Sequence, residues 1–246
     1  MHYWFWLCPL LAFASGAIPF GLIIGKSRGI DIREHGSGNI GATNVLRVLG
    51  KKYGLPCFLL DALKGFIPVV LAYNLIQIDG EAPSFRHLAI LDHIATTVTA
   101  GQQFQAQLVR VITALAAVLG HTFTPFAGFK GGKGVATSGG VLLALMPAAV
   151  VILLAIWWIV FKLTRYVSLA SIVAAAALPL LTHLGARFHH INNDKSLQTL
   201  WEAGTWNRPL FYFSVTIALL VILKHRTNIV RLMSGTENRF EKSAKS

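Results

Sequence analysis

The chain has 246 residues, of which 54% are hydrophobic and 13% are charged, whereas an ordinary soluble domain carries about 25% charged residues. A chain this apolar cannot cover itself with a water-facing surface, and this excludes a soluble globular protein. The formal net charge of +12 would indicate nucleic-acid binding in a soluble protein, whereas in a membrane protein it indicates basic loops on the cytoplasmic face and no nucleic acid.

Several apolar segments are long enough to cross the ~30 Å hydrocarbon core of a bilayer as helices, which takes roughly 17–25 residues. They lie at residues 3–25, 54–76, 107–126, 147–163, 166–183 and 208–224. We interpret the first as a retained span and not as a signal peptide, because no lysine or arginine precedes it and Lys26 follows it. A shorter apolar piece at 135–145 is either a short helix of its own or the start of one long helix kinked at Pro147.

The positions of the basic residues decide between these two alternatives. Most of the 22 lysines and arginines fall on one side of the bilayer only if 135–145 crosses or re-enters the membrane as a separate element. The sequence therefore predicts one all-α membrane domain over 1–246 with seven transmembrane helices, the N-terminus outside and the C-terminus in the cytoplasm. In the outer connections, 77–106 and 184–207, residues 87–100 are expected to form a surface helix. The tail from Ser234 is expected to fray.

The loop after the first span is rich in glycine and in hydrogen-bonding side chains. Glycines let the backbone expose its N–H groups to the oxygens of an anion, and a helix beginning near Ala42 would add its positive N-terminal end. Arg47 can hold a phosphate through two hydrogen bonds. The candidate binding residues of this loop are Gly36, Ser37, Gly38, Asn39, Thr43 and Asn44. The alternative is a flexible loop followed by a capped helix.

A second basic, glycine-rich loop precedes the short apolar piece. Lys133 is surrounded by glycines, which suits a phosphate at the mouth of an apolar element; these glycines are Gly131, Gly132 and Gly134. The loop is not a Walker A loop, because Gly134 follows Lys133 where serine or threonine is needed. If Lys130 and Lys133 only set the topology, the basic charge is explained but the crowding of glycines around one lysine is not.

Polar residues also lie in or beside the spans. Asp61 and Lys64 stand three residues apart inside the second span, where ionisable groups are costly, so we predict that they pair and that Lys64 reaches toward substrate. After the last span, His225 and Asn228 share a face if the helix continues, and Arg226 and Arg231 would then lie nearer the headgroups. The alternative is a helix end whose basic side chains only extend to the membrane surface. His121 and Ser168 lie at cytoplasmic span ends, and His121 could equally cap or pack.

Taken in order, these motifs resemble one family across nearly the whole chain. They are residues 17–21, 36–44 with Arg47, 61–65, 120–121 with 131–137, 164–168 and 225–228. The family is that of the bacterial membrane glycerol-3-phosphate acyltransferases that use acyl phosphate as donor. The resemblance implies a seven-helix enzyme of the bacterial inner membrane with its active site on the cytoplasmic face. It also implies that the chain makes lysophosphatidic acid and phosphate from acyl phosphate and glycerol 3-phosphate, the first step of phospholipid synthesis.

The resemblance also implies the roles of individual residues. Ser37, Lys133, His225 and Asn228 are the expected catalytic residues, and the phosphates would be held by Arg47 and Lys133. The other expected substrate-binding residues are Gly36, Gly38, Asn39, Thr43, Asn44, Lys64, His121, Gly131, Gly132, Gly134 and Ser168. No cofactor or metal is implied. Whether the enzyme that makes acyl phosphate docks on this chain stays open, as does the role of the outer connections, which are longer than the family pattern needs.

Some alternatives remain beside this interpretation. The base that accepts the hydroxyl proton is either His225 or a substrate phosphate, and we favour the phosphate because no carboxylate adjoins His225 in sequence. The pairs His87…Asp92 and His189…Asp194 match the His-x4-Asp pattern of other glycerolipid acyltransferases, but both lie in outer loops and are rejected. A transporter of an anionic metabolite also fits broken helices and buried charges, and a lipid-binding scaffold is a third hypothesis.

Overall fold

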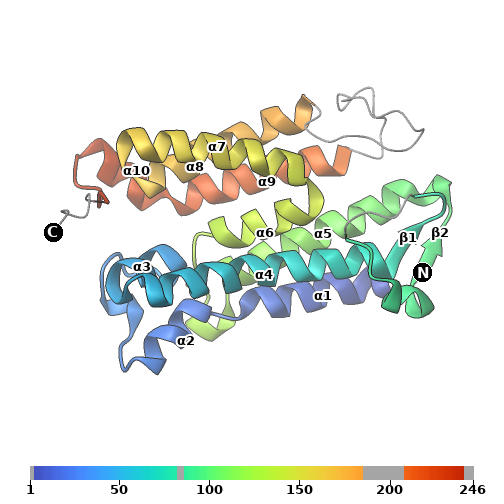
Figure 1. Ribbon diagram of the computed structural model, residues 1–246, viewed down its shortest axis with the longest axis horizontal. Coiled ribbons are helices and arrows are strands. Elements are labelled where there is room, and N and C mark those ends of the chain that lie inside the picture. The colour runs from blue at the N-terminus through green and yellow to red at the C-terminus, as the bar shows by residue number, and fades with distance from the viewer. Residues whose placement is uncertain (1–2, 82–85, 185–207, 241–246) are drawn as a thin grey trace.

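The computed structural model describes residues 3–81, 86–184 and 208–240. Figure 1 shows the helices lying side by side in two layers, with α6 between them. The helices are α1 Trp4–Ala17, α2 Phe20–Ser27, α3 Ala42–Leu49, α4 Lys51–Leu75, α5 Gln103–Thr122, α6 Val135–Leu145, α7 Pro147–Thr164, α8 Val167–His183, α9 Arg208–Lys224 and α10 Arg226–Met233. In the first layer α1 packs on α5 and α4, and in the second α8 packs between α7 and α9.

Within the described residues, four helical segments are long and apolar enough to cross a membrane. They are Trp4–Ser27, Lys51–Leu75, Ala100–Ala127 and Pro147–Thr164. The pair α9 and α10 qualifies as a fifth if counted as one span bent by 56°, and α6 and α8 are shorter apolar helices. The chain is therefore a mostly helical membrane protein, while the count of seven crossings stays a prediction.

The first apolar segment is not the single helix expected over 3–25. It breaks between α1 and α2, because Pro19 has no backbone N–H to continue the helical hydrogen bonds. The last carbonyls of a helix need partners from elsewhere. Here the Ala17 carbonyl accepts a hydrogen bond from Thr124 Oγ1 at 2.6 Å, and the Ile18 carbonyl accepts one from Lys64 Nζ at 2.7 Å. Side chains of α4 and of the segment after α5 thus hold the break.

The expected surface helix at 87–100 is also wrong. This stretch forms a short 3₁₀ turn, Ala89–Ile94, and then strand β2, Thr96–Val98, which pairs in parallel with β1, Ile76–Ile78. The β-branched residues of both strands favour this pairing, so the fold is not strictly all-α. In Figure 1 the sheet lies at the end that holds the N-terminus, opposite α2 and α3.

Helix α6 is a separate element that packs closely on α4. The two backbones approach so closely at Gly65 and Gly140 that a Cβ on Gly140 would overlap the Ala62 carbonyl. This contact fixes the beginning of α6, and with it the preceding glycine-rich loop, against the middle of α4.

Candidate active site

A cavity of about 480 Å³ lies between α3, α4 and α6 on one side and α7, α8 and α9 on the other. The three polar regions expected from sequence all contribute to it, although they are far apart in the chain. Its polar lining includes Ser37, Asn39, Thr43, Asn44, Arg47, Asp61, His121, Lys133, Ser138, Ser168, Ser171, His225, Asn228, Arg231 and Glu237.

The remaining walls of the cavity are apolar. Apolar side chains of α3, α4 and α6 to α9 line them, among them Leu46, Leu55, Phe58, Leu142, Val150, Leu153, Leu154, Trp157, Ala174, Ala175, Leu178, Ile217 and Val221. The cavity therefore suits a ligand with an anionic or polar head and a hydrocarbon tail.

The first loop is held in shape by one buried amide. Asn44 donates from Nδ2 to the carbonyls of Ile32 and His35, both at 3.0 Å, and its Oδ1 accepts a hydrogen bond from the Ser37 N–H at 2.8 Å. Gly36 and Gly38 have φ values of 62° and 69°, a left-handed conformation that favours glycine. These interactions leave the Ser37 hydroxyl without a hydrogen-bond partner among the described residues, at the cavity wall.

Arg47 enters the cavity from the same loop's helix, α3. In the part of the chain that the structure describes, its guanidinium makes no hydrogen bond or ion pair and lies 5.4 Å from the centre of the Phe240 ring. Its fork of N–H donors is therefore available for a phosphate or carboxylate ligand.

The second loop is attached to the end of α5 and does not present all of its N–H groups to an anion. The N–H groups of Gly131 and Gly132 donate to the carbonyls of Thr122 and His121, both at 3.2 Å. Gly134, with φ 80°, is the N-cap residue directly before α6 and lines the cavity. Between them Lys133 extends its ammonium group to Asn228 Oδ1, at 2.5 Å.

Burial lowers the pKa of Lys133 to about 8, with nearby Arg231 and Arg47 acting in the same direction and Glu237 opposing them. In the role that the family resemblance implies, this ammonium holds a phosphate, and it loses its charge as the pH rises through its pKa. For the acyl transfer that the resemblance implies, we therefore expect kcat/KM to fall roughly eightfold between about pH 7.5 and 9, since this parameter reports the free enzyme. Lys133→Arg should abolish this decline, because a guanidinium stays charged.

Folding stability provides the control for this pH prediction. Because the pKa of Lys133 is lower in the folded state than its ordinary 10.5, the unfolded chain binds more protons between about pH 8 and 10.5, and this group makes stability rise with pH. A melting temperature that does not fall while activity declines would assign the decline to the site. An unchanged kcat/KM up to pH 9 would contradict the assignment.

The third region lies at the break between α9 and α10. His225 is buried, and its Nδ1 donates to the Val221 carbonyl at 2.8 Å. In the neutral ring, Nε2 is then the nitrogen that can accept a hydrogen bond. Asn228, one turn further, donates from Nδ2 to Glu237 Oε1 at 2.6 Å while its Oδ1 accepts from Lys133.

The C-terminal segment from Ser234 to Phe240 does not fray as expected. Glu237 Oε1 also accepts from Ser168 Oγ at 2.8 Å, and its Oε2 pairs with Arg231 Nε at 2.8 Å. The Phe240 N–H donates to the Arg165 carbonyl at 3.1 Å. Arg231 is therefore bound to a carboxylate that lines the cavity. These hydrogen bonds and the ion pair hold the pKa of Glu237 below its usual range, against the effect of burial.

The comparison with known proteins identifies the chain. A family model described as glycerol-3-phosphate acyltransferase matches residues 6–235. The chain belongs to the glycerol-3-phosphate acyltransferase family. A relative of that name from Fusobacterium nucleatum is 43% identical over 235 residues, covering 94% of this chain and 96% of the relative. A relative of the same name from Geobacter sulfurreducens is 41% identical, covering 94% and 95%.

Two solved structures of a glycerol 3-phosphate acyltransferase are similar to this chain in fold and sequence. The crystal structure of PlsY, an integral membrane glycerol 3-phosphate acyltransferase in its glycerol 3-phosphate form, is 37% identical, with a TM-score of 0.71 over 96% of this chain and 94% of that one. The lysophosphatidic acid form of PlsY is 36% identical, with a TM-score of 0.69 over the same shares.

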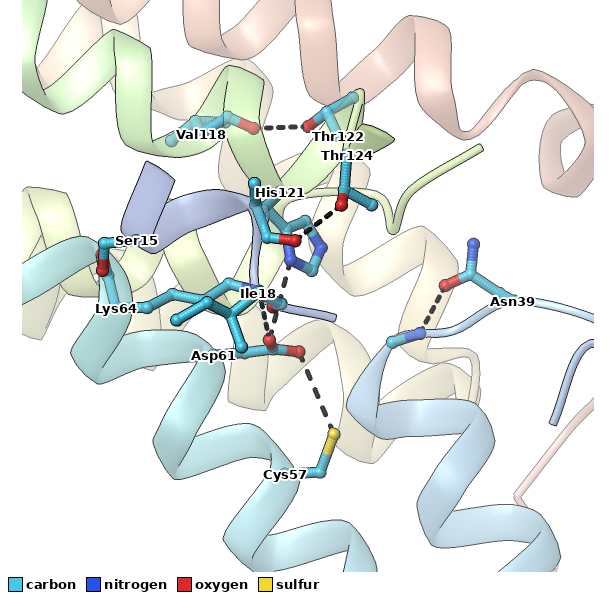
Figure 2. Close-up of polar contacts among 12 residues, drawn as sticks. Ser15, Ile18, Asn39, Cys57, Asp61, Lys64, Val118, His121, Thr122 and Thr124 are labelled. Carbon is cyan, nitrogen blue, oxygen red and sulfur yellow. Dashed lines mark hydrogen bonds and ion pairs between the residues drawn. The ribbon is translucent and has the colours of Figure 1, made fainter. Parts of the chain in front are cut away.

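The structure separates the family's motif residues into those that line the cavity and those that support it. Lys64 lies outside the lining: it pairs with Asp61 at 2.7 Å, as predicted, but its Nζ donates to the Ile18 carbonyl and does not reach the cavity (Figure 2). The glycines that also lie outside the lining are Gly36, Gly38, Gly131 and Gly132. They shape the loops from which neighbouring side chains reach the cavity.

Glu237, which joins Ser168, Asn228 and Arg231, was not predicted from the sequence, because it lies in a short polar tail. The available signal was an aromatic residue, Phe240, in that tail. Of the two rejected His-x4-Asp pairs, His87 and Asp92 lie partly exposed, 3.4 Å apart, beside the β1–β2 sheet and not in the cavity lining. His189 and Asp194 lie outside the described residues.

Proposed function

We propose that this chain transfers a fatty acyl group from acyl phosphate to glycerol 3-phosphate and releases lysophosphatidic acid and phosphate. The observation that supports this most directly is a cavity whose cationic, hydrogen-bonding end continues into an apolar one. A donor with an anionic head and a long tail, and an acceptor that is a small phosphate ester, together match both ends. The proposal includes a bacterial inner-membrane location, seven crossings with the C-terminus in the cytoplasm, and a site on that face.

The reaction needs positioning and charge neutralisation more than covalent catalysis. The glycerol hydroxyl oxygen forms a bond to the acyl carbonyl carbon, the bond from that carbon to the phosphate oxygen breaks, and its electron pair leaves with the phosphate. Two anionic substrates repel each other, so Arg47 and Lys133 would hold their phosphates close together in a partly dry cavity. Ser37, His225 and Asn228 would orient the reacting groups.

The hydroxyl proton passes to a phosphate oxygen in this proposal. His225 is the protein alternative, but its ring bonds a backbone carbonyl, Val221, and not a carboxylate that would stabilise a protonated imidazole. The transporter alternative is weaker, since Asp61 and Lys64, the charges deepest in α4, pair with each other. Docking of an enzyme that makes acyl phosphate stays a proposal about the cytoplasmic face.

The choice of donor tests this proposal. Purified protein in phospholipid vesicles would receive glycerol 3-phosphate with either palmitoyl phosphate or palmitoyl coenzyme A. We expect lysophosphatidic acid to form at least about 100-fold faster from palmitoyl phosphate, because only that donor places a phosphate beside the reacting carbonyl for Lys133 or Arg47 to hold. Equal rates, or a faster reaction from the thioester, would reject acyl phosphate as the donor.

A further inference from the structure

Asp61, Lys64 and His121 form a buried polar cluster that the proposed reaction does not use. Figure 2 shows Lys64 and His121 converging on the Asp61 carboxylate from α4 and from the end of α5. Asp61 Oδ1 is 2.7 Å from Lys64 Nζ and 3.6 Å from His121 Nδ1, and all three side chains are at most 5% exposed. Ionisable groups this deep in a membrane protein are functional or paired by default.

The break in the first apolar segment explains the presence of Lys64 in this cluster. Lys64 donates to the Ile18 carbonyl at that break, and its own backbone carbonyl accepts from Ser15 Oγ at 3.2 Å. Asp61 neutralises Lys64. These contacts hold α4 against α1 and explain Lys64, but they do not require that Asp61 should also face His121.

His121, the third residue of the cluster, contacts the glycine-rich loop. The His121 ring lies directly against Gly132, so closely that a Cβ on this glycine would overlap Nε2 of the ring. The Gly132 N–H also donates to the His121 carbonyl, so His121 contacts this glycine with both its ring and its backbone. Asp61 Oδ1 faces Nδ1 of the same ring at 3.6 Å, and the ring limits how closely the loop can approach the end of α5.

We propose that Asp61 and His121 are positioning residues. Asp61 orients the imidazole ring of His121, this ring is the surface against which Gly132 packs (its seat), and the contact sets where Lys133 presents its ammonium group. This inference rests on the proposed function, in which that ammonium holds a substrate phosphate. Lys133 is the next residue in the chain, and its 2.5 Å hydrogen bond to Asn228 depends on the position of the loop. A displacement of about 1 Å at such a group can cost about 100-fold in rate.

A double-mutant cycle between His121 and Gly132 tests the seat. Gly132→Ala places a methyl group where the ring lies and should lower kcat/KM by about 100-fold, whereas His121→Ala, which frees the loop, should lower it about tenfold. If the ring is the seat, the added methyl fits into the space left by the missing ring. The double variant should then recover to the level of His121→Ala, about tenfold above Gly132→Ala alone.

Multiplying losses, about 1000-fold in the double variant, would overturn the proposal, because Gly132 would then act through contacts of its own. Gly101→Ala serves as the matched control, because a Cβ there meets only Thr99 Oγ1, at 3.9 Å. It should leave kcat/KM unchanged both in the wild type and in His121→Ala. His121→Val replaces His121→Ala in the cycle if the latter does not fold, since its branched side chain is smaller than the ring and apolar.

The role of Asp61 is tested separately from its neutralisation of Lys64. Asp61→Asn with Lys64→Met removes both charges, so no unpaired charge is left buried. Lys64→Met alone leaves the Asp61 carboxylate buried and unpaired, so if Asp61 only neutralises Lys64, kcat/KM of the double variant should equal or exceed that of Lys64→Met. If Asp61 also orients His121, kcat/KM should lie about tenfold below that of Lys64→Met, and an equal or higher value would reject its role in positioning.

Titration calorimetry of the same variants with inorganic phosphate gives their phosphate affinities as a second readout. A wild-type protein that binds phosphate but forms no lysophosphatidic acid would reject the proposed reaction while leaving the cycle readable. Recovery of phosphate affinity in the His121–Gly132 double variant would still support the seat, and multiplying losses would still overturn it.

Discussion

Replacing Lys133 by methionine is expected to lower kcat/KM for acyl transfer by about 1000-fold. The ammonium group is the cation that joins the glycine-rich loop to Asn228 across the cavity. Losing a preorganised charge of this kind costs about 100- to 1000-fold in the transition state alone. Here the loss also leaves the Glu237 carboxylate less well balanced by positive charge next to an anionic substrate. Initial rates across a range of glycerol 3-phosphate concentrations would measure the effect.

Lys130→Met is the matched control for this variant. Lys130 lies in the same loop, carries the same charge and is exposed outside the cavity lining. We expect it to keep activity within about twofold. A comparable loss in both variants would mean that the loop's charge acts through membrane topology and not through a contact with substrate.

The second large effect is expected at Arg47. Arg47→Ala should lower kcat/KM by about 100- to 1000-fold, because it removes the guanidinium that faces the cavity with no hydrogen bond or ion pair among the described residues. Arg47→Lys should recover only part of this loss, since an ammonium cannot form the paired hydrogen bonds of a guanidinium. The Michaelis constants for both substrates would locate the phosphate that Arg47 holds.

The control for Arg47 is Arg28→Lys, since Arg28 is exposed and lies over the Tyr53 ring, outside the cavity lining. This change should leave both Michaelis constants unaltered. Wild-type kinetics for Arg47→Lys would show that charge alone suffices at this position and would contradict the two-point contact.

Sequence patterns predicted most helices well, because an apolar segment of sufficient length specifies a membrane helix almost by itself. They could not predict which prolines break a helix. Pro9 lies within α1 and Pro56 within α4 without ending either helix, whereas Pro19 separates α1 from α2. The difference comes from distant residues, Lys64 and Thr124, which accommodate the carbonyls at that break.

The same limit applies to the site. The pair of Asp61 and Lys64 was predictable because both lie on one helical face, three residues apart. Its contact with His121 joins residues that are far apart in sequence and depends on how α4 packs against α5. The glycine N–H groups expected to bind an anion at Gly131 and Gly132 are instead bonded to the end of α5. Local composition identified the loop, but only packing determines which of its groups face the cavity.

The proposed reaction joins an acyl phosphate to glycerol 3-phosphate in this cavity. It is tested most directly by supplying purified protein in lipid vesicles with palmitoyl phosphate and isotope-labelled glycerol 3-phosphate, and by quantifying both products with mass spectrometry and a phosphate assay. We expect labelled lysophosphatidic acid and phosphate in equal amounts from the wild type, and only about a thousandth of that rate from Lys133→Met. Folded wild-type protein that forms no labelled lysophosphatidic acid, or a Lys133→Met variant as active as the wild type, would contradict it.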